Sequence, residues 1–203
     1  MGMDAEGLAG VIGSRVRHER IERGWTLDRL AEVAGVSRRM VVSVEQGTVN
    51  PSIGTLLRLS DALGVGLPAL VEPPHRARTK VTRAGAGAVL WRGDTGGRGV
   101  LVAGTEPPDV LELWDWTLAP GEEHASEAHS EGTRELLHVQ EGTLVITLAG
   151  ESFTLSAGDA LSFVGDEAHS YANPGDMPAR FSLAVFEPGV GSAHRSDGDG
   201  ADG

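Results

Sequence analysis

Apolar side chains recur at three- and four-residue intervals through the first part of the chain, which is the spacing of one buried face of a helix. The first predicted helix has Ile12, Val16 and Ile21 on its apolar face and ends at Gly24. The later helices begin at residues suited to a helix N-terminus, which are Thr26, Ser37, Ser52 and, in the first turn of a short last helix, Pro68. The pattern therefore predicts an all-α bundle of five helices.

The second and third of these helices form a pair joined by a turn at Gly35. The apolar stripe of the second helix consists of Leu27, Leu30, Ala31 and Ala34. The third helix turns Val41 and Val44 inward with Val36, and its outward positions are Arg38, Arg39, Val42, Ser43 and Gln46. Two short helices joined by such a glycine turn form a helix-turn-helix, whose second helix enters the major groove of DNA.

After Ala88 the pattern changes to short β-rich runs separated by glycine, proline and aspartate, with no helical period. The runs are Val100–Ala103, Val110–Leu118, Leu136–Val139, Thr143–Leu148, Ser152–Leu155, Ala160–Val164 and Arg180–Phe186. Closely spaced short strands with turn residues between them predict an all-β sandwich or barrel. The expected fold class is therefore α+β multidomain, with an all-α bundle followed by an all-β barrel.

Four segments are expected from this change of pattern: a helical domain over 8–72, a linker over 73–87, a β domain over 88–188 and a tail over 189–203. The linker begins with two prolines and has no apolar period, which predicts an extended connector. The tail is rich in glycine and aspartate and has no large hydrophobic residue, so we expect it to be disordered.

The balance of charged residues also changes within the expected linker. Residues 1–83 carry 12 Lys or Arg against 9 Asp or Glu, a balance of +3, whereas residues 84–203 carry 5 against 20, a balance of −15. Because phosphate repels an acidic surface, any contact with nucleic acid is expected in the first part. The small positive balance also fits an ordinary solvated surface, so the assignment depends on sequence motifs.

The amino-acid composition indicates where in the cell the protein is expected. The chain has no cysteine, which excludes disulfides and thiolate metal sites. No apolar run approaches the roughly 20 residues that cross a bilayer, and the first ten residues do not resemble a signal peptide. These observations predict a cytoplasmic protein without a membrane partner.

The helical part resembles the Cro and phage-repressor-like (XRE) helix-turn-helix family over about residues 8 to 71. The resemblance is carried by residues 30–37 (LAEVAGVS), 44–47 (VEQG), Asn50-Pro51 and residues 56–64 (LLRLSDALG). It implies a double-stranded DNA operator as partner. Because one such unit contacts few base pairs, it also implies a homodimer on two half-sites.

The resemblance places the DNA-binding residues around the start of the third helix: Thr26, Ser37, Arg38, Arg39, Met40, Val42 and Ser43. Arg and Ser hydrogen-bond base edges, and Met40 or Val42 can touch a thymine methyl. Thr26, at the start of the preceding helix, is expected to contact phosphate. Two alternatives stay open: the arginines hold phosphates without reading sequence, and Met40 packs in the core. Glu45 would repel phosphate, so we expect it to brace the bundle.

The β domain resembles the cupin superfamily over about residues 88 to 187. The segment 120–142 is similar to the first conserved cupin motif, and Gly158-Asp159 followed by His169 and Asn173 is similar to the second. The resemblance implies a cupin barrel, also called a double-stranded β-helix. A pocket in such a barrel is expected to hold a small-molecule effector.

Metal-binding cupins use two histidines separated by one residue, a glutamate four positions later and a histidine in the second motif. The resemblance carries these ligands over to His129, Glu135 and His169, while Glu131 stands where the second histidine is expected. Imidazoles and carboxylates can together hold Fe, Mn, Ni or Zn, but a second carboxylate lowers the charge of the site and alters its redox chemistry. Alternatively, these residues hydrogen-bond an organic ligand or one another.

Several other residues have weaker interpretations. Trp114 and Trp116 share one strand face, where they line the barrel mouth, form a subunit interface or fill the core. His124 and His138 are expected to be incidental. The acidic residues of the loop, which are Glu122, Glu123, Glu127 and Glu131, suggest either a cationic ligand or a solvated loop.

The resulting hypothesis is a DNA-binding transcription regulator, not an enzyme, whose cupin domain senses a small molecule. No nucleophile with its base and no glycine-rich phosphate loop is evident in the sequence. The rival hypothesis is an iron-dependent cupin oxidoreductase, because phosphonate epoxidases also join a repressor-like helical domain to an iron cupin.

Overall fold

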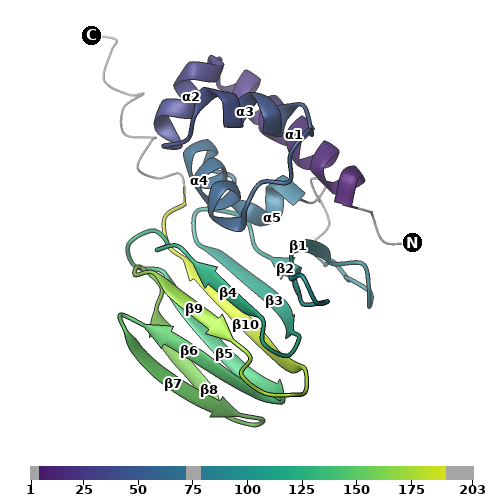
Figure 1. Ribbon diagram of the computed structural model, residues 1–203. Coiled ribbons are helices and arrows are strands. Elements are labelled where there is room, and N and C mark those ends of the chain that lie inside the picture. The colour runs from purple at the N-terminus through teal and green to yellow at the C-terminus, as the bar shows by residue number, and fades with distance from the viewer. Residues whose placement is uncertain (1–4, 72–78, 191–203) are drawn as a thin grey trace. The chain divides into compact units, whose positions relative to one another are not determined.

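A computed structural model of the chain describes residues 5–71 and 79–190 (Figure 1). The chain divides into two compact units: the first comprises Met1–Ala88, Thr105–Val110 and Gly189–Gly203, and the second comprises Val89–Gly104 and Leu111–Pro188. Positions 73–78 of the expected linker and positions 191–203 of the expected disordered tail lie outside the described residues.

The described part of the first unit contains five helices, which confirms the predicted five-helix bundle. Their bounds are α1 Ala5–Glu22, α2 Leu27–Val33, α3 Arg38–Glu45, α4 Ile53–Leu63 and α5 Gly66–Val71. The hydroxyl groups of Thr26, Ser37 and Ser52 cap α2, α3 and α4 by accepting hydrogen bonds from the backbone N–H groups three residues later. Gly64 ends α4 with a left-handed backbone, φ 64°, which glycine adopts without strain.

The helices share one apolar core. Its largest fully buried side chains are Ile12, Leu30, Leu56, Leu59, Leu63, Leu67 and Leu70. The expected place of Ile21 in this core is wrong, because its side chain is 53% exposed. Ile21 lies five positions after Val16, which turns it about 140° around the helix from the buried face. The buried face of α1 therefore includes Ile12 and Val16 but not Ile21.

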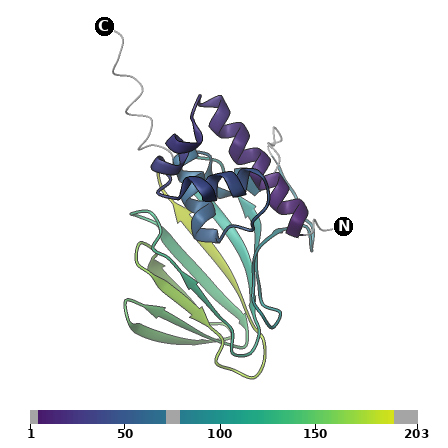
Figure 2. The ribbon, with the colours of Figure 1, turned by 45° about the horizontal axis from the view of Figure 1, so that its top comes forward.

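Helices α1 and α3 pack against each other (Figure 2), and Gly13 of α1 allows their close approach. A Cβ at this position would lie 2.3 Å from the carbonyl oxygen of Val44. Further along α1, Nε and Nη2 of Arg20 donate to Oε1 and Oε2 of Glu45 at 2.6 and 2.9 Å. Glu45 therefore braces the bundle, as expected. These contacts hold α3 in a fixed position against α1.

The second unit is built from two sheets. The strands are β1 Ala88–Arg92, β2 Arg98–Gly104, β3 Val110–Leu118, β4 Glu123–Ser126, β5 Arg134–Glu141, β6 Thr143–Leu148, β7 Glu151–Ser156, β8 Ala160–Val164, β9 His169–Ala172 and β10 Ala179–Glu187. One sheet has the order β1-β2-β3-β10-β5-β8 and the other β4-β9-β6-β7. Figure 1 shows the two sheets stacked face to face. This arrangement is consistent with a cupin barrel and confirms the all-β prediction.

All seven expected strands form, and three further strands, β1, β4 and β9, were not expected. Two of these, β4 (EHAS) and β9 (HSYA), are short and contain almost no large apolar residue, so they lack the alternation that marks a strand in sequence. They pair with each other from Glu123↔Ala172 to Ser126↔His169. This pairing places His169 of the second motif opposite Ser126, three residues before His129 of the first.

Candidate functional site

The third helix, α3, presents a polar face on the helical unit. Val41 and Val44 are buried and hold this helix on the bundle. Thr26, Ser37, Arg38 and Arg39 are exposed, while Met40, Val42 and Ser43 are half-buried. All seven expected DNA-binding residues therefore have solvent access, and Met40 is not enclosed in the core.

The two arginines at the start of α3 have different surroundings. Nε of Arg38 lies 3.1 Å from Oδ1 of Asp28, and both side chains are more than half exposed. Among the described residues, no ion pair involves Arg39. The turn before α3 is made by Gly35, whose φ of 61° favours glycine. The result is the geometry of a helix-turn-helix with basic side chains on its second helix.

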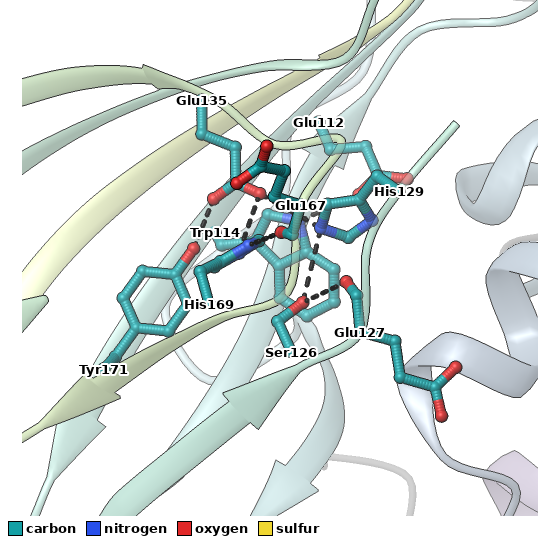
Figure 3. Close-up of polar contacts among 9 residues, drawn as sticks. All are labelled: Glu112, Trp114, Ser126, Glu127, His129, Glu135, Glu167, His169 and Tyr171. Carbon is teal, nitrogen blue, oxygen red and sulfur yellow. Dashed lines mark hydrogen bonds and ion pairs between the residues drawn. The ribbon is translucent and has the colours of Figure 1, made fainter. Parts of the chain in front are cut away.

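In the second unit, His129, Glu135 and His169 bring three possible ligand atoms together (Figure 3). Glu135 projects inward from β5, His169 begins β9, and His129 lies in the connection between β4 and β5. Oε1 of Glu135 lies 3.0 Å from Nε2 of His129 and 3.2 Å from Nε2 of His169. The three ligand atoms are all within 4.8 Å of one another.

Surrounding groups orient this trio. The hydroxyl of Tyr171 donates a hydrogen bond to Oε2 of Glu135, so that Oε1 faces the imidazoles. Nδ1 of His169 lies 2.8 Å from the carbonyl oxygen of Glu167. Because a carbonyl only accepts, Nδ1 carries a proton, and Nε2 is the atom that faces Glu135. Nε2 of His129 also lies 3.4 Å from Oγ of Ser126.

Electrostatics favour an ionised carboxylate at Glu135. Burial by itself raises the pKa of Glu135, but its contacts with His129 and His169 outweigh burial and lower that pKa to about 2. Burial lowers the pKa of His169, whereas the Glu135 carboxylate acts more strongly in the other direction, so the pKa of His169 is raised. Burial and the charge of Glu135 raise the pKa of Tyr171 well above its usual value. The tyrosine hydroxyl therefore remains a donor.

The trio fits a divalent metal. Oε1 of Glu135 and Nε2 of His169 are buried, and neither has a hydrogen-bond partner among the described residues, although they lie at ion-pair distance. A metal about 2.1 Å from each ligand atom holds neighbouring ligand atoms about 3.0 to 3.4 Å apart. The separations of Glu135 from the two histidines, 3.0 and 3.2 Å, match that spacing, and the two imidazole nitrogens lie within 4.8 Å of each other. Two imidazoles and one carboxylate form the facial ligand set of many metal sites.

The fourth residue expected in this pocket, Glu131, is exposed and does not belong to the group. His129 faces the barrel, but Glu131 follows it in a turn that carries the chain outward to Gly132, whose φ is 86°. The structure thus brings together three of the four candidates. The alternatives considered for them are a metal site, hydrogen bonds to an organic ligand and hydrogen bonds to one another, and all three would use these side chains.

His124 lies outside the group of three possible ligands, so its incidental role stays a prediction, but it belongs to a strand and not to an acidic loop. Its ring lies on β4 within an aromatic cluster, with centroids 4.7 Å from Trp116 and 5.3 Å from Trp91. Burial, followed by the charge of His169, lowers the pKa of His124 to about 4, so this imidazole is neutral at neutral pH. By contrast, His138 is exposed on β5, as the alternation of that strand predicts.

Trp114 and Trp116 are buried and stack on each other with ring centroids 5.8 Å apart. They fill the barrel core, which was one of the alternatives. In the acidic loop, Glu122 accepts hydrogen bonds from the backbone N–H groups of Thr95, Gly97 and Ala119. This carboxylate therefore holds two loops together, which supports a structural role for it.

One buried carboxyl group was missed by the sequence interpretation. Glu112 is 1% exposed, and its Oε2 accepts a hydrogen bond from Nε1 of Trp114 at 2.9 Å (Figure 3). Burial, followed by the charge of Glu187, raises the pKa of Glu112 to about 8. The alternation of residues 110–118 was the available signal, because it puts position 112 on the same inward face as both tryptophans.

Family models match both units: a helix-turn-helix model matches residues 16–70, and a cupin domain model matches residues 114–186. Among known proteins, the chain is similar to the HTH-type transcriptional regulator SutR of Escherichia coli, with 28% identity over 90% of this chain and 98% of that protein. It is also similar to the HTH-type transcriptional regulator PuuR of the same organism, with 28% identity over 84% and 91% of the two chains.

A solved structure has the same fold. An HTH_3 family transcriptional regulator from Vibrio cholerae superposes with a TM-score of 0.70 at 24% identity, covering 91% of this chain and 99% of that chain. In the described part of the chain, no helix combines the length and apolar character needed to cross a membrane.

Proposed function

We propose that this chain, which belongs to the XRE-type helix-turn-helix transcriptional regulators with a C-terminal cupin domain, binds a near-palindromic operator as a homodimer. In this proposal the cupin barrel holds a small-molecule effector that changes operator affinity. The observation that carries the proposal is the exposed basic start of α3, held in place by the buried Val41 and Val44. A regulator of DNA works beside the chromosome, so the proposal includes a cytoplasmic location.

The base contacts are proposed for Arg38, Arg39 and Ser43, with Met40 or Val42 against a thymine methyl group. Arginine offers two donors to the O6 and N7 atoms of guanine, and a serine hydroxyl can pair with several base edges. Thr26 and Ser37 lie at the N-termini of α2 and α3, where backbone N–H groups favour a phosphate. The acidic second unit would repel DNA, so contacts are confined to the helical unit.

In the barrel, His129, Glu135 and His169 are proposed to hold a divalent Fe, Mn, Ni or Zn ion. Two observations support the site. Oε1 of Glu135 and Nε2 of His169 are buried without a hydrogen-bond partner among the described residues, and Oε1 lies 3.0 and 3.2 Å from the two imidazole nitrogens. Such a metal would give an anionic group of an effector a positive charge to bind. The effector acts on DNA binding only if it favours one arrangement of the two units over another.

The decisive experiment for the regulator is selection of bound sequences from random duplex DNA by the purified full-length chain. We expect a near-palindromic site whose sequence preference is relaxed by Arg39→Ala. Arg92→Ala is the matched control, because it removes the same charge from the exposed end of β1 in the second unit. A protein that shows no sequence preference at moderate salt would contradict the proposal.

The second candidate function is a metal-dependent oxidoreductase, and the facial set of two imidazoles and a carboxylate is the observation that favours it. Metal analysis of protein purified without chelator, followed by turnover assays with Fe(II) and oxygen, separates the two functions. Stoichiometric iron with turnover supports the enzyme. Sequence-selective DNA binding without turnover supports the regulator.

A further inference from the structure

The six-stranded sheet has an outer face that carries large apolar side chains. Burial alternates along β3, β5, β8 and β10, so every second residue points away from the barrel interior. Three of the outward apolar side chains are Leu113, 45% exposed, Leu136, 53% exposed, and Val164, 41% exposed. We call this surface, from Leu113 on β3 to Val164 on β8, the outer sheet face.

The apolar residues of the outer sheet face lie on adjacent strands of one sheet. Leu136 pairs with Ala184 of β10, and Phe186 follows two positions later on the same side of that strand. On the other side of β5, Val164 pairs with Arg134, which is two residues from Leu136. Strand β10 lies between β3 and β5 in this sheet (Figure 1), so the outward side chains of β10 lie between Leu136 and Leu113. Exposed apolar side chains gathered on adjacent strands of one face are a candidate interaction surface.

The charge on this face differs from that of the rest of the domain. Residues 84–203 carry 20 Asp or Glu against 5 Lys or Arg. On β3, β5, β8 and β10, however, the outward charged side chains are two of each sign: Asp115, Glu141, Arg134 and Arg180. Arg180 lies 3.6 Å from Asp115 and 3.2 Å from Glu141. The outer sheet face is therefore electrically balanced.

We propose that the outer sheet face is the surface on which a second copy of this chain docks. Two strongly acidic domains repel each other across most of their surfaces, and the repulsion is least where the charges cancel. A two-fold axis brings a patch against its own copy, which requires the patch to be self-complementary. A surface with an apolar centre and equal numbers of Arg and acidic side chains meets that requirement. Two copies of Leu136 and Val164 would exclude water from each other.

This inference rests on the homodimer of the proposed function and names its interface, but its test measures mass and distance instead of DNA binding. The two can therefore fail separately. Sedimentation of the full chain at tens of micromolar should give twice the chain mass of 21.2 kDa. Leu113→Glu combined with Leu136→Glu should halve the measured mass. The control Met177→Glu places the same charge at a 66% exposed residue outside the sheet and should leave the dimer intact.

A second measurement keeps the proposal testable if the glutamate variant fails to fold, which circular dichroism would reveal. Because the chain contains no cysteine, Leu136→Cys and Met177→Cys each introduce one site for a nitroxide label. Dipolar spectroscopy should give a short distance between copies labelled at position 136 and a longer one for position 177. A monomeric wild type, a dimer that survives both glutamates, or a distance at position 136 no shorter than that at position 177 would overturn the proposal.

Discussion

Tyr171 donates its hydroxyl hydrogen to Oε2 of Glu135, and this bond leaves Oε1 of the same carboxylate facing two imidazoles. Ligands of a metal are oriented by such outer contacts, whose loss costs about 10- to 100-fold in metal affinity. Tyr171→Phe should therefore weaken Zn(II) or Ni(II) binding to the full chain by that amount, measured by competition with a chromophoric chelator.

Removal of an exposed imidazole serves as the control for this change. His138→Ala alters a solvent-facing side chain of β5 and should leave affinity unchanged. Glu135→Gln should abolish binding, because it removes the charge of the only carboxylate in the trio. Equal affinity in wild type and Tyr171→Phe would show that the tyrosine does not position the glutamate.

The helical unit was predictable from local signals, whereas the barrel was predictable only in part. The caps of α2, α3 and α4 are hydroxyl residues just before apolar periods, and such signals depend on a few neighbouring residues. His124 has polar neighbours in sequence, and its burial comes from Trp91, Trp116 and Tyr171 on other strands. No local pattern encodes that environment. Family motifs located His129, Glu135 and His169, but not the outward position of Glu131.

Gly13 and Gly10 lie three residues apart on α1 and should respond in opposite ways to alanine. A Cβ at position 13 would lie 2.3 Å from a carbonyl oxygen of α3, whereas one at position 10 meets nothing within 4 Å. Gly13→Ala should therefore separate α1 from α3 and lower the free energy of unfolding by about 1 to 3 kcal/mol. Gly10→Ala should raise it by about 0.5 to 1 kcal/mol, because glycine is a poor helix former. Urea titration followed by circular dichroism measures both changes.

Glu112 should make the barrel less stable as the pH rises. Its pKa is about 8 in the folded chain, against an ordinary value of 4.5, because of burial and Glu187. Below the ordinary value both states hold the proton. Between the two values the unfolded chain ionises while the folded chain keeps its proton, so stability falls. Glu112→Gln should remove this loss and raise the melting temperature at pH 8 more than at pH 5.

The measurement for Glu112 is a thermal melt in chelator from pH 5 to pH 8. The opposite shift at Glu135, whose pKa is lowered to about 2, acts only at lower pH. Its stabilising effect is complete above the ordinary carboxyl pKa of 4.5 and is lost as the pH falls toward 2, outside the window of this experiment. A variant that shows the same pH dependence as wild type would mean that Glu112 is ionised in the folded chain at neutral pH.

Asp28 should weaken DNA binding even though it is not expected to contact a base. Its Oδ1 lies 3.1 Å from Nε of Arg38, one of the proposed base-contacting residues. A carboxylate at this place competes with DNA for the arginine and repels nearby phosphates. Asp28→Asn should therefore tighten binding to random duplex DNA and make the slope of log affinity against log salt steeper by up to about one. Fluorescence anisotropy at several salt concentrations measures both quantities.

Stability provides a second check on Asp28. The side chains of Asp28 and Arg38 are 75% and 59% exposed, and exposed ion pairs contribute about 0 to 1 kcal/mol, so the variant should melt close to wild type. Glu151→Gln is the matched control for charge, because it removes one carboxylate from exposed β7 in the second unit. If both substitutions tighten binding equally, the effect comes from total charge and not from the release of Arg38. If Asp28→Asn weakens binding, the ion pair positions Arg38 for DNA instead of competing with it.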